Sequence, residues 1–263
     1  MCTSFEYRRK GTNIPPFLTF LKYTDEKEKS AEVVSKILNN FKKNQKLLDI
    51  GAGNADYLLL ILKHLGNPKG LQYYLLEPSK DLINILKNRG SDFPNNSKLE
   101  IINSTWEEYN PTQRFDYILA SHLYHISKED YQRDFIKMTS SLIKGGKLIF
   151  ILRDADDVYE FKKTFGPLLF NEDYVPKILD ETLPIFVRIA KKNNLSIKRH
   201  KAIACLNIPI DKSEQDTKRI IEFFLSKQWK DIPKEIQLDA LDFIKKKEGK
   251  FEQIDGILEI TKL

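Results

Sequence analysis

Two glycines and two carboxylates form the pattern with the clearest chemical meaning in this sequence. Gly51 and Gly53 follow an apolar run that contains Asp49, and an apolar helical segment comes after them. Glycines between a strand and a helix let the backbone turn tightly and approach a bound ligand closely. Glu77 ends the next apolar run, 24 positions after Gly53, where a carboxylate can accept hydrogen bonds from both hydroxyls of a ribose. The pattern indicates a nucleoside-binding site.

The residue in the place of the third glycine of the dinucleotide fingerprint narrows the choice of ligand. That residue is Asp56, and a carboxylate at a helix N-terminus would repel a pyrophosphate that needs the same helix dipole. We therefore expect a cofactor that contains no phosphate, such as S-adenosylmethionine. Asp49 would then reach the cationic amino group of the cofactor or orient the loop.

The elements that must position these residues alternate along the first two thirds of the chain, as in βαβ units with a parallel sheet. Apolar runs predict strands at 46–50, 71–76, 99–102, 115–120 and 147–152. Helical spacing predicts helices at 25–41, 57–62, 78–87 and 131–143. The last third predicts helices at 158–165 and 180–193, a strand at 196–206, a helical insert at about 213–247 and a final strand at 257–260.

These elements predict an α/β fold: a Rossmann-like, seven-stranded, mostly parallel sheet with an antiparallel last strand, helices on both faces and a helical cap. We expect a single domain over residues 1–263. Its parts would be N-terminal cap helices at about 1–45, a cofactor-binding core at 46–206, a helical insert at 207–250 and the last strand at 251–263. The insert would cover the carboxyl edge of the sheet, where open α/β sheets bind ligands.

Composition excludes several classes of protein. No apolar run approaches the ~18 residues of a membrane span, and the first residues resemble no secretory signal, so we expect a cytoplasmic protein, and a monomer. Two cysteines and four scattered histidines predict no metal site. The net charge of +6 suits either nucleic-acid docking or solvated helix faces, and we favour the second because lysines alternate with acidic residues.

The order and spacing of four motifs over residues 47–152 resemble the class I methyltransferase superfamily. The motifs are 49–53, 77–79, 115–126 and 142–148. The resemblance implies S-adenosylmethionine as the cofactor. In place of the superfamily's common adenine-binding aspartate, this chain has a serine and a threonine. The cofactor-binding residues that the resemblance implies are Asp49, Gly51, Ala52, Gly53, Glu77, Pro78, Ser104, Thr105 and Ser121.

The segment after the fourth strand, residues 121–125, bears on the methyl acceptor. It lacks the Asn/Asp-Pro-Pro-Tyr/Phe motif of many methyltransferases that act on nucleobase amines or glutamine amides. This absence argues against a nucleic acid as the acceptor. An amine must lose its proton before it is methylated, so His122 could position or deprotonate the acceptor. Alternatively, His122 packs on the cofactor.

The whole chain also resembles the histamine N-methyltransferase group. That resemblance implies an amine-binding glutamate at Glu26, and it places His122 where the group has a glutamine. Gln253 falls near the group's asparagine, and Asp255 follows two residues later. The implied acceptor pocket would bind a small cation by charge pairing and cation–π contacts. Its expected residues are Glu26, His122, Tyr124, Phe161, Gln253 and Asp255.

Each acceptor residue has an ordinary structural alternative. Glu26 suits the first turn of any helix, Phe161 has helical spacing typical of a core residue, and Gln253 could face solvent on a strand. We expect N-methylation of a small amine. The alternatives are methylation of RNA or protein, with the basic surface as the docking face, and a non-catalytic S-adenosylmethionine-binding module.

Overall fold

The computed structural model describes residues 15–39, 41–123, 130–170, 174 and 176–263. The chain divides into two compact units, each made of three segments. Unit 1 contains the described residues of Met1–Lys29, Arg153–Ile178 and Ala202–Asp255, and unit 2 those of Ser30–Leu152, Leu179–Lys201 and Gly256–Leu263. Residues 153–178, expected in the cofactor core, thus group with the helical insert and not with the sheet.

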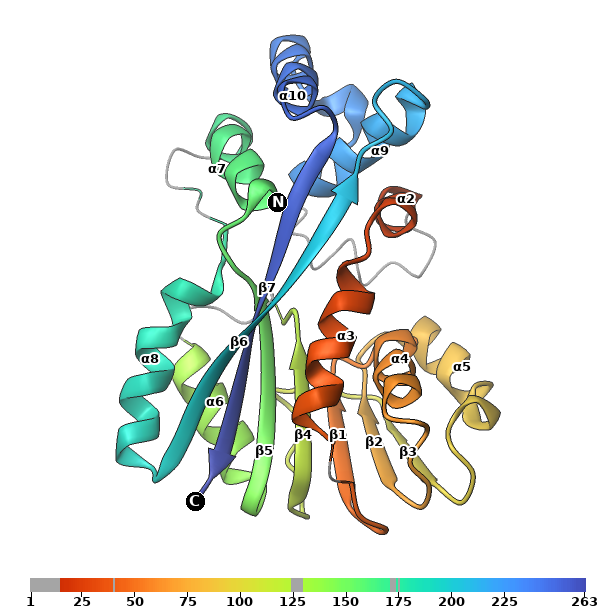
Figure 1. Ribbon diagram of the computed structural model, residues 1–263, viewed down its shortest axis with the longest axis vertical. Coiled ribbons are helices and arrows are strands. Elements are labelled where there is room, and N and C mark those ends of the chain that lie inside the picture. The colour runs from red at the N-terminus through yellow and green to blue at the C-terminus, as the bar shows by residue number, and fades with distance from the viewer. Residues whose placement is uncertain (1–14, 40, 124–129, 171–173, 175) are drawn as a thin grey trace. The chain divides into compact units, whose positions relative to one another are not determined.

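A sheet is the centre of unit 2. Among the described residues, seven strands join it in the order β3-β2-β1-β4-β5-β7-β6. Neighbours from β3 to β5 pair in parallel, while β7 runs opposite to β5 and β6 (Figure 1). The predicted α/β fold is therefore confirmed. The strands are β1 (Lys46–Ile50), β2 (Gln72–Leu76), β3 (Lys98–Ile102), β4 (Phe115–Ser121), β5 (Leu142–Arg153), β6 (Leu195–Asn207) and β7 (Lys250–Lys262).

Helices cover both faces of this sheet, because alternate strand residues point to opposite sides. On one side, Ile118 and Phe150 pack against α6 (Asp130–Ser140) and α8 (Leu179–Lys192). On the other side, the ring of Tyr117 lies 4.7 Å from that of Phe41, just beyond α3 (Glu26–Ile37). The remaining helices of unit 2 are α4 (Asp56–His64) and α5 (Lys80–Lys87).

Unit 1 has a core of its own, rich in phenylalanine. Apolar residues of α7 (Asp157–Leu169), α9 (Glu214–Leu225) and α10 (Lys234–Lys246) form it, together with Phe20 of α2 (Pro15–Tyr23) and Phe251 of β7. A short 3-10 helix, Trp229–Asp231, separates α9 from α10. The predicted helical insert is thus two helices, and its place over the sheet edge stays a prediction.

Several element boundaries differ from those expected. The helix predicted to reach residue 143 ends at Ser140, and β5 begins at Leu142, opposite Phe115 of β4. The last strand begins at Lys250, one residue before the predicted last segment of 251–263 and seven before the apolar run at 257–260. In the part of the chain that the structure describes, no helix is both long and apolar enough to cross a membrane.

Candidate functional site

The loop after β1 has the backbone conformation that its glycines predict. Gly51 and Gly53 have φ angles of 74° and 61°, in the left-handed region. The N–H groups of Gly51 and Ala52 both donate to the carbonyl of Leu76, at 2.9 and 3.0 Å, so the loop is tied to the end of β2. A Cβ atom on Gly51 would lie 3.1 Å from the side chain of Leu123. A larger residue at position 51 would therefore be both strained and crowded.

Glu77, directly after β2, joins the glycine loop to the next turn. Its buried carboxylate accepts one hydrogen bond from the N–H of Gly53 at 2.9 Å and another from the N–H of Ser79 at 2.8 Å. Both bonds come from backbone N–H groups, so they fix the carboxylate between the glycine loop and the turn after β2. Its place at the carboxyl end of a parallel strand is where open α/β sheets bind ligands.

Asp49 is a buried acid beside this carboxylate. Burial, followed by the negative charge of Glu77, raises its pKa to about 7. A cation next to Asp49 would favour the ionised form and lower this pKa again. The residues present therefore fit a cofactor that has an ammonium group and no phosphate, as S-adenosylmethionine does.

The residues after β3 make local hydrogen bonds. The Ser104 hydroxyl donates to the carbonyl of Thr105 at 3.1 Å, and the Thr105 hydroxyl accepts from the N–H of Glu108 at 3.3 Å. Sequence analysis did not single out Asn103, whose amide donates to the carbonyls of Glu77 and Pro78, both at 3.0 Å. Its position at the carboxyl end of a strand was the signal that could have identified it.

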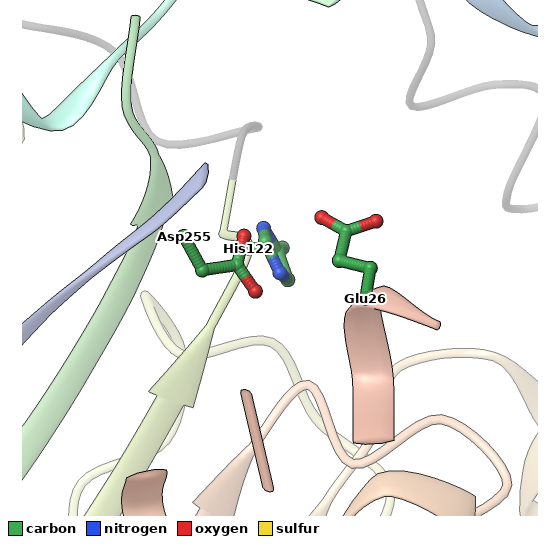
Figure 2. A group of neighbouring side chains, drawn as sticks. All are labelled: Glu26, His122 and Asp255. Carbon is green, nitrogen blue, oxygen red and sulfur yellow. The ribbon is translucent and has the colours of Figure 1, made fainter. Parts of the chain in front are cut away.

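The end of β4 presents Ser121 and His122, both half-buried. His122 follows the strand (Figure 2), has a left-handed backbone with φ 53°, and donates its N–H to the carbonyl of Ile151 at 2.9 Å. For a residue with a Cβ atom this conformation costs roughly 1–2 kcal/mol, and such strain is concentrated at functional positions. Tyr124, expected in the acceptor pocket, lies outside the described residues.

Unit 1 contains a buried polar cluster around Glu26, the first residue of α3. The carboxylate of Glu26 contacts the guanidinium of Arg153 and lies 3.5 Å from the amide nitrogen of Gln253. Thr24 accepts from the N–H of Glu26 at 3.1 Å and donates to the side chain of Gln253. Gln253 is fully buried, so the alternative that it faces solvent is wrong.

Arg153 and Asp156 complete this cluster, and sequence analysis missed both. Arg153 donates to the Asp156 carboxylate at 2.6 Å. The same carboxylate accepts from the N–H of Tyr159 at 2.8 Å, which caps α7, and from the N–H of Ile254 at 3.0 Å. Arg153 and Tyr159 are each three residues from Asp156, and an aspartate at a helix start is a capping signal that could have identified it. The contact with Ile254, 98 positions away, has no local signal.

Asp255 brings a second carboxylate close to Glu26. Both side chains are buried, and one oxygen of each lies within 4.8 Å of the other. Figure 2 shows Glu26 at the start of α3 and Asp255 on β7. Two buried carboxylates at this distance repel each other when ionised, so the pair favours a cation or a shared proton.

Phe161 lies among aromatic side chains. Its side chain is fully buried in the core of unit 1, with ring centroids 4.8 Å from Phe165, 5.4 Å from Phe224 and 5.5 Å from Phe243. Aromatic neighbours account for its position, as the core alternative predicts, and a place for Phe161 in the acceptor pocket has no support from these contacts.

Comparison with known proteins decides the family. A model described as a methyltransferase domain matches residues 22–232. The chain belongs to this methyltransferase family. S-adenosylmethionine, the cofactor expected from the sequence, is thereby confirmed. The finer likeness to the histamine N-methyltransferase group stays a prediction.

One curated relative of the chain is an O-methyltransferase. A curated malonyl-[acyl-carrier protein] O-methyltransferase from Ilyobacter polytropus is 24% identical over 186 residues, which are 71% of this chain and 64% of that protein. The chain thus spans less than two thirds of the length of that relative.

Solved structures share the fold of the chain. The YcgJ protein of Bacillus subtilis has a TM-score of 0.58 at 14% identity and covers 89% of this chain and 98% of its own. A phosphoethanolamine N-methyltransferase of Haemonchus contortus, solved with S-adenosylmethionine, has a TM-score of 0.53 at 16% identity and covers 89% of this chain and 52% of its own.

Proposed function

We propose that this S-adenosylmethionine-dependent methyltransferase methylates the nitrogen of a small cationic amine. The observation that carries the proposal is the proximity of two buried carboxylates, Glu26 and Asp255, in unit 1. A protonated amine between them would relieve their repulsion and gain two charged hydrogen bonds.

The charge of the surrounding cluster supports a cationic acceptor. The cluster has three buried carboxylates, those of Glu26, Asp156 and Asp255, and one guanidinium among its described residues, that of Arg153. The contacts of Arg153 with two of these carboxylates already compensate its positive charge. An anionic acceptor would meet net negative charge in this cluster, whereas an ammonium would be attracted to it.

We assign cofactor binding and acceptor binding to different units. S-adenosylmethionine supplies an electrophilic methyl group, and we assign its binding to unit 2, with Glu77 accepting from the ribose and Asp49 pairing with the amino group. We assign acceptor binding to Glu26 and Asp255, one of which takes the proton that the amine must lose. The remaining cofactor residues that we assign are Gly51, Ala52, Gly53, Pro78, Ser104, Thr105 and Ser121.

Three further residues would orient the acceptor. Gln253 and Thr24 hold one side of the Glu26 carboxylate, which limits the directions from which Glu26 can accept a hydrogen bond. For His122, the left-handed backbone restricts where its ring points, so we assign to it positioning or deprotonation of the acceptor. Orientation of this kind is the main contribution that a protein makes to an in-line displacement.

The test is methyl transfer from labelled S-adenosylmethionine to a panel of small primary and secondary amines, with malonyl-carrier protein, bulk RNA and cell protein alongside. We expect label on a small amine, with and without a chelator. Activity lost to the chelator would indicate that the carboxylate pair binds a divalent cation. Label on no amine would contradict the proposal.

Matched variants test the role of Glu26. Glu26 and Glu28 both lie in the first turn of α3, but only Glu26 is buried. We expect Glu26→Gln to raise the KM for the amine or lower kcat by about tenfold to a hundredfold, the effect of ~1.4–2.8 kcal/mol, and to leave cofactor affinity unchanged. Glu28→Gln should behave as wild type. Equal kinetics of the two variants would remove Glu26 from the site.

A second candidate is O-methylation of a carboxylate on a carrier protein, which the similarity to the Ilyobacter polytropus enzyme favours. The net negative charge of the unit 1 cluster argues against a carboxylate acceptor. Label on malonyl-carrier protein would favour O-methylation over methylation of an amine. Label on RNA alone, lost steeply as salt rises, would favour the basic surface as a docking face, and cofactor binding without any transfer would indicate a non-catalytic module.

A further inference from the structure

Arg89, just beyond α5, contacts the loop that the cofactor site is built on. Its guanidinium donates to the carbonyl of Asn54 at 2.6 Å and to the carboxylate of Asp56 at 2.5 Å, while its Nε donates to Asp92 at 2.7 Å. A planar guanidinium can hold acceptors in several directions at once, which an ammonium cannot do. We propose that Arg89 is a positioning residue that keeps the glycine loop in the conformation that binds the cofactor.

The conformation of the loop needs support. Ala55, the residue before α4, has a left-handed backbone with φ 63°, which is unfavourable for a residue with a Cβ atom. Ala55 also gives α4 no side-chain cap, although helices are normally stabilised by one. Both features make an uncapped, strained start to the helix, so other contacts must stabilise it.

Those contacts come from Asn54, Asp56 and Arg89. The side-chain amide of Asn54 donates to the Asp56 carboxylate at 2.5 Å, and its oxygen accepts from the N–H of Asp56 at 3.2 Å. Arg89 then joins this local pair to the segment after α5, 33 to 35 residues further along the chain. Because Glu77 holds Gly53 from the other side, the loop is fixed at both ends.

The charge of Arg89 serves the same purpose. Asp56 lies in the first turn of α4, where the helix dipole favours its carboxylate, and Arg89 holds that carboxylate in one place. Without Arg89 the segment 54–56 would sample further conformations. Binding would then have to select the competent one, which lowers the apparent affinity by the fraction that is populated.

The proposal rests on the methyltransferase assignment and not on the identity of the acceptor, so cofactor affinity tests it. We expect Arg89→Met to bind S-adenosylhomocysteine about five- to tenfold more weakly than wild type in calorimetry. Arg89→Lys should lie between the two, because one ammonium can pair with Asp56 but cannot also reach both other acceptors.

Arg199 gives a matched control in the same unit. It pairs with Asp180 at 2.7 Å, and their side chains are 29% and 51% exposed, against 24% and 51% for Arg89 and Asp56. Arg199→Met should therefore lose a comparable ion pair and keep wild-type affinity. The melting temperature of each free protein, measured alongside, separates a general loss of stability from a loss of affinity.

A double-mutant cycle adds a readout that a purely structural role would not move. If Arg89 acts through Asp56, then Asp56→Asn and Arg89→Met should weaken affinity less together than the product of their separate effects. Wild-type affinity in Arg89→Met, or an equal loss of affinity in Arg199→Met, would overturn the role of Arg89 and leave the cofactor assignment standing. A wild-type chain that binds no S-adenosylhomocysteine would overturn the cofactor assignment as well.

Discussion

The buried carboxyl of Asp49 couples the stability of the free chain to cofactor binding. Its pKa is raised to about 7 in the folded chain, from 3.8, so between these values the folded state holds a proton that the unfolded state releases. Stability therefore falls as pH rises from about 4 to 7, and the cost is complete above 7. We expect Asp49→Asn to stabilise the free protein at pH 8 by about 1–3 kcal/mol, less than the full linkage energy because a buried amide needs partners. Urea unfolding measures this gain; a destabilised Asp49→Asn would contradict it.

The same carboxyl predicts how cofactor affinity depends on pH. In the proposed site the ionised form pairs with the ammonium of the cofactor, and below pH 7 a proton competes for it. Affinity for S-adenosylhomocysteine should therefore fall by up to about tenfold per unit as pH drops from 7 to 5.5. In Asp49→Asn the affinity should be lower at pH 8 and nearly flat over this range. Parallel pH profiles for the two proteins would show that another group is responsible.

Among the elements, the start of α7 depends on one side chain more than an ordinary helix does. Asp156 caps the helix and also holds Arg153 and the backbone of β7. Ser213 caps the start of α9 by accepting from the N–H of Asp216 at 3.2 Å. Among the contacts described for its hydroxyl, this capping bond is the only one. We expect Asp156→Ala to lower the free energy of unfolding by about 3 kcal/mol and Ser213→Ala by about 1 kcal/mol. The larger loss of stability in Asp156→Ala should shrink to that of Ser213→Ala when Arg153 is also replaced by Met. Equal losses in the two alanine variants would show that Asp156 does no more than cap its helix.

How far the elements could be predicted depends on how local their signals are. The strand β1, its glycine turn and Glu77 follow from residues that are neighbours in sequence, so they were predicted together with their cofactor. Contacts of Glu26 join residues 127 and 227 positions away, and no periodicity encodes such pairings. Phe161 shows the same limit: its helical spacing was visible, but the aromatic neighbours that bury it come from α9, α10 and β7.

For the whole molecule, the same limit applies to the domain organisation. Composition along the chain shows no linker, and the single domain over residues 1–263 stays a prediction. The described segments gather around two cores, and the chain passes between the units five times, since each contributes three segments. Long-range packing alone reveals this division, because the strands β6 and β7 pass from one unit to the other without interruption.

The sheet order has a consequence for how the chain is made. The last strand in the sequence, β7, lies between β5 and β6. A ribosome synthesises β6 long before β7, so the emerging β6 has no sheet neighbour and β5 has an open edge. Such an edge is prone to pair with other chains. Unit 2 can therefore complete its sheet only once β7 has left the ribosome, and until then the open edge of β5 can pair with another chain.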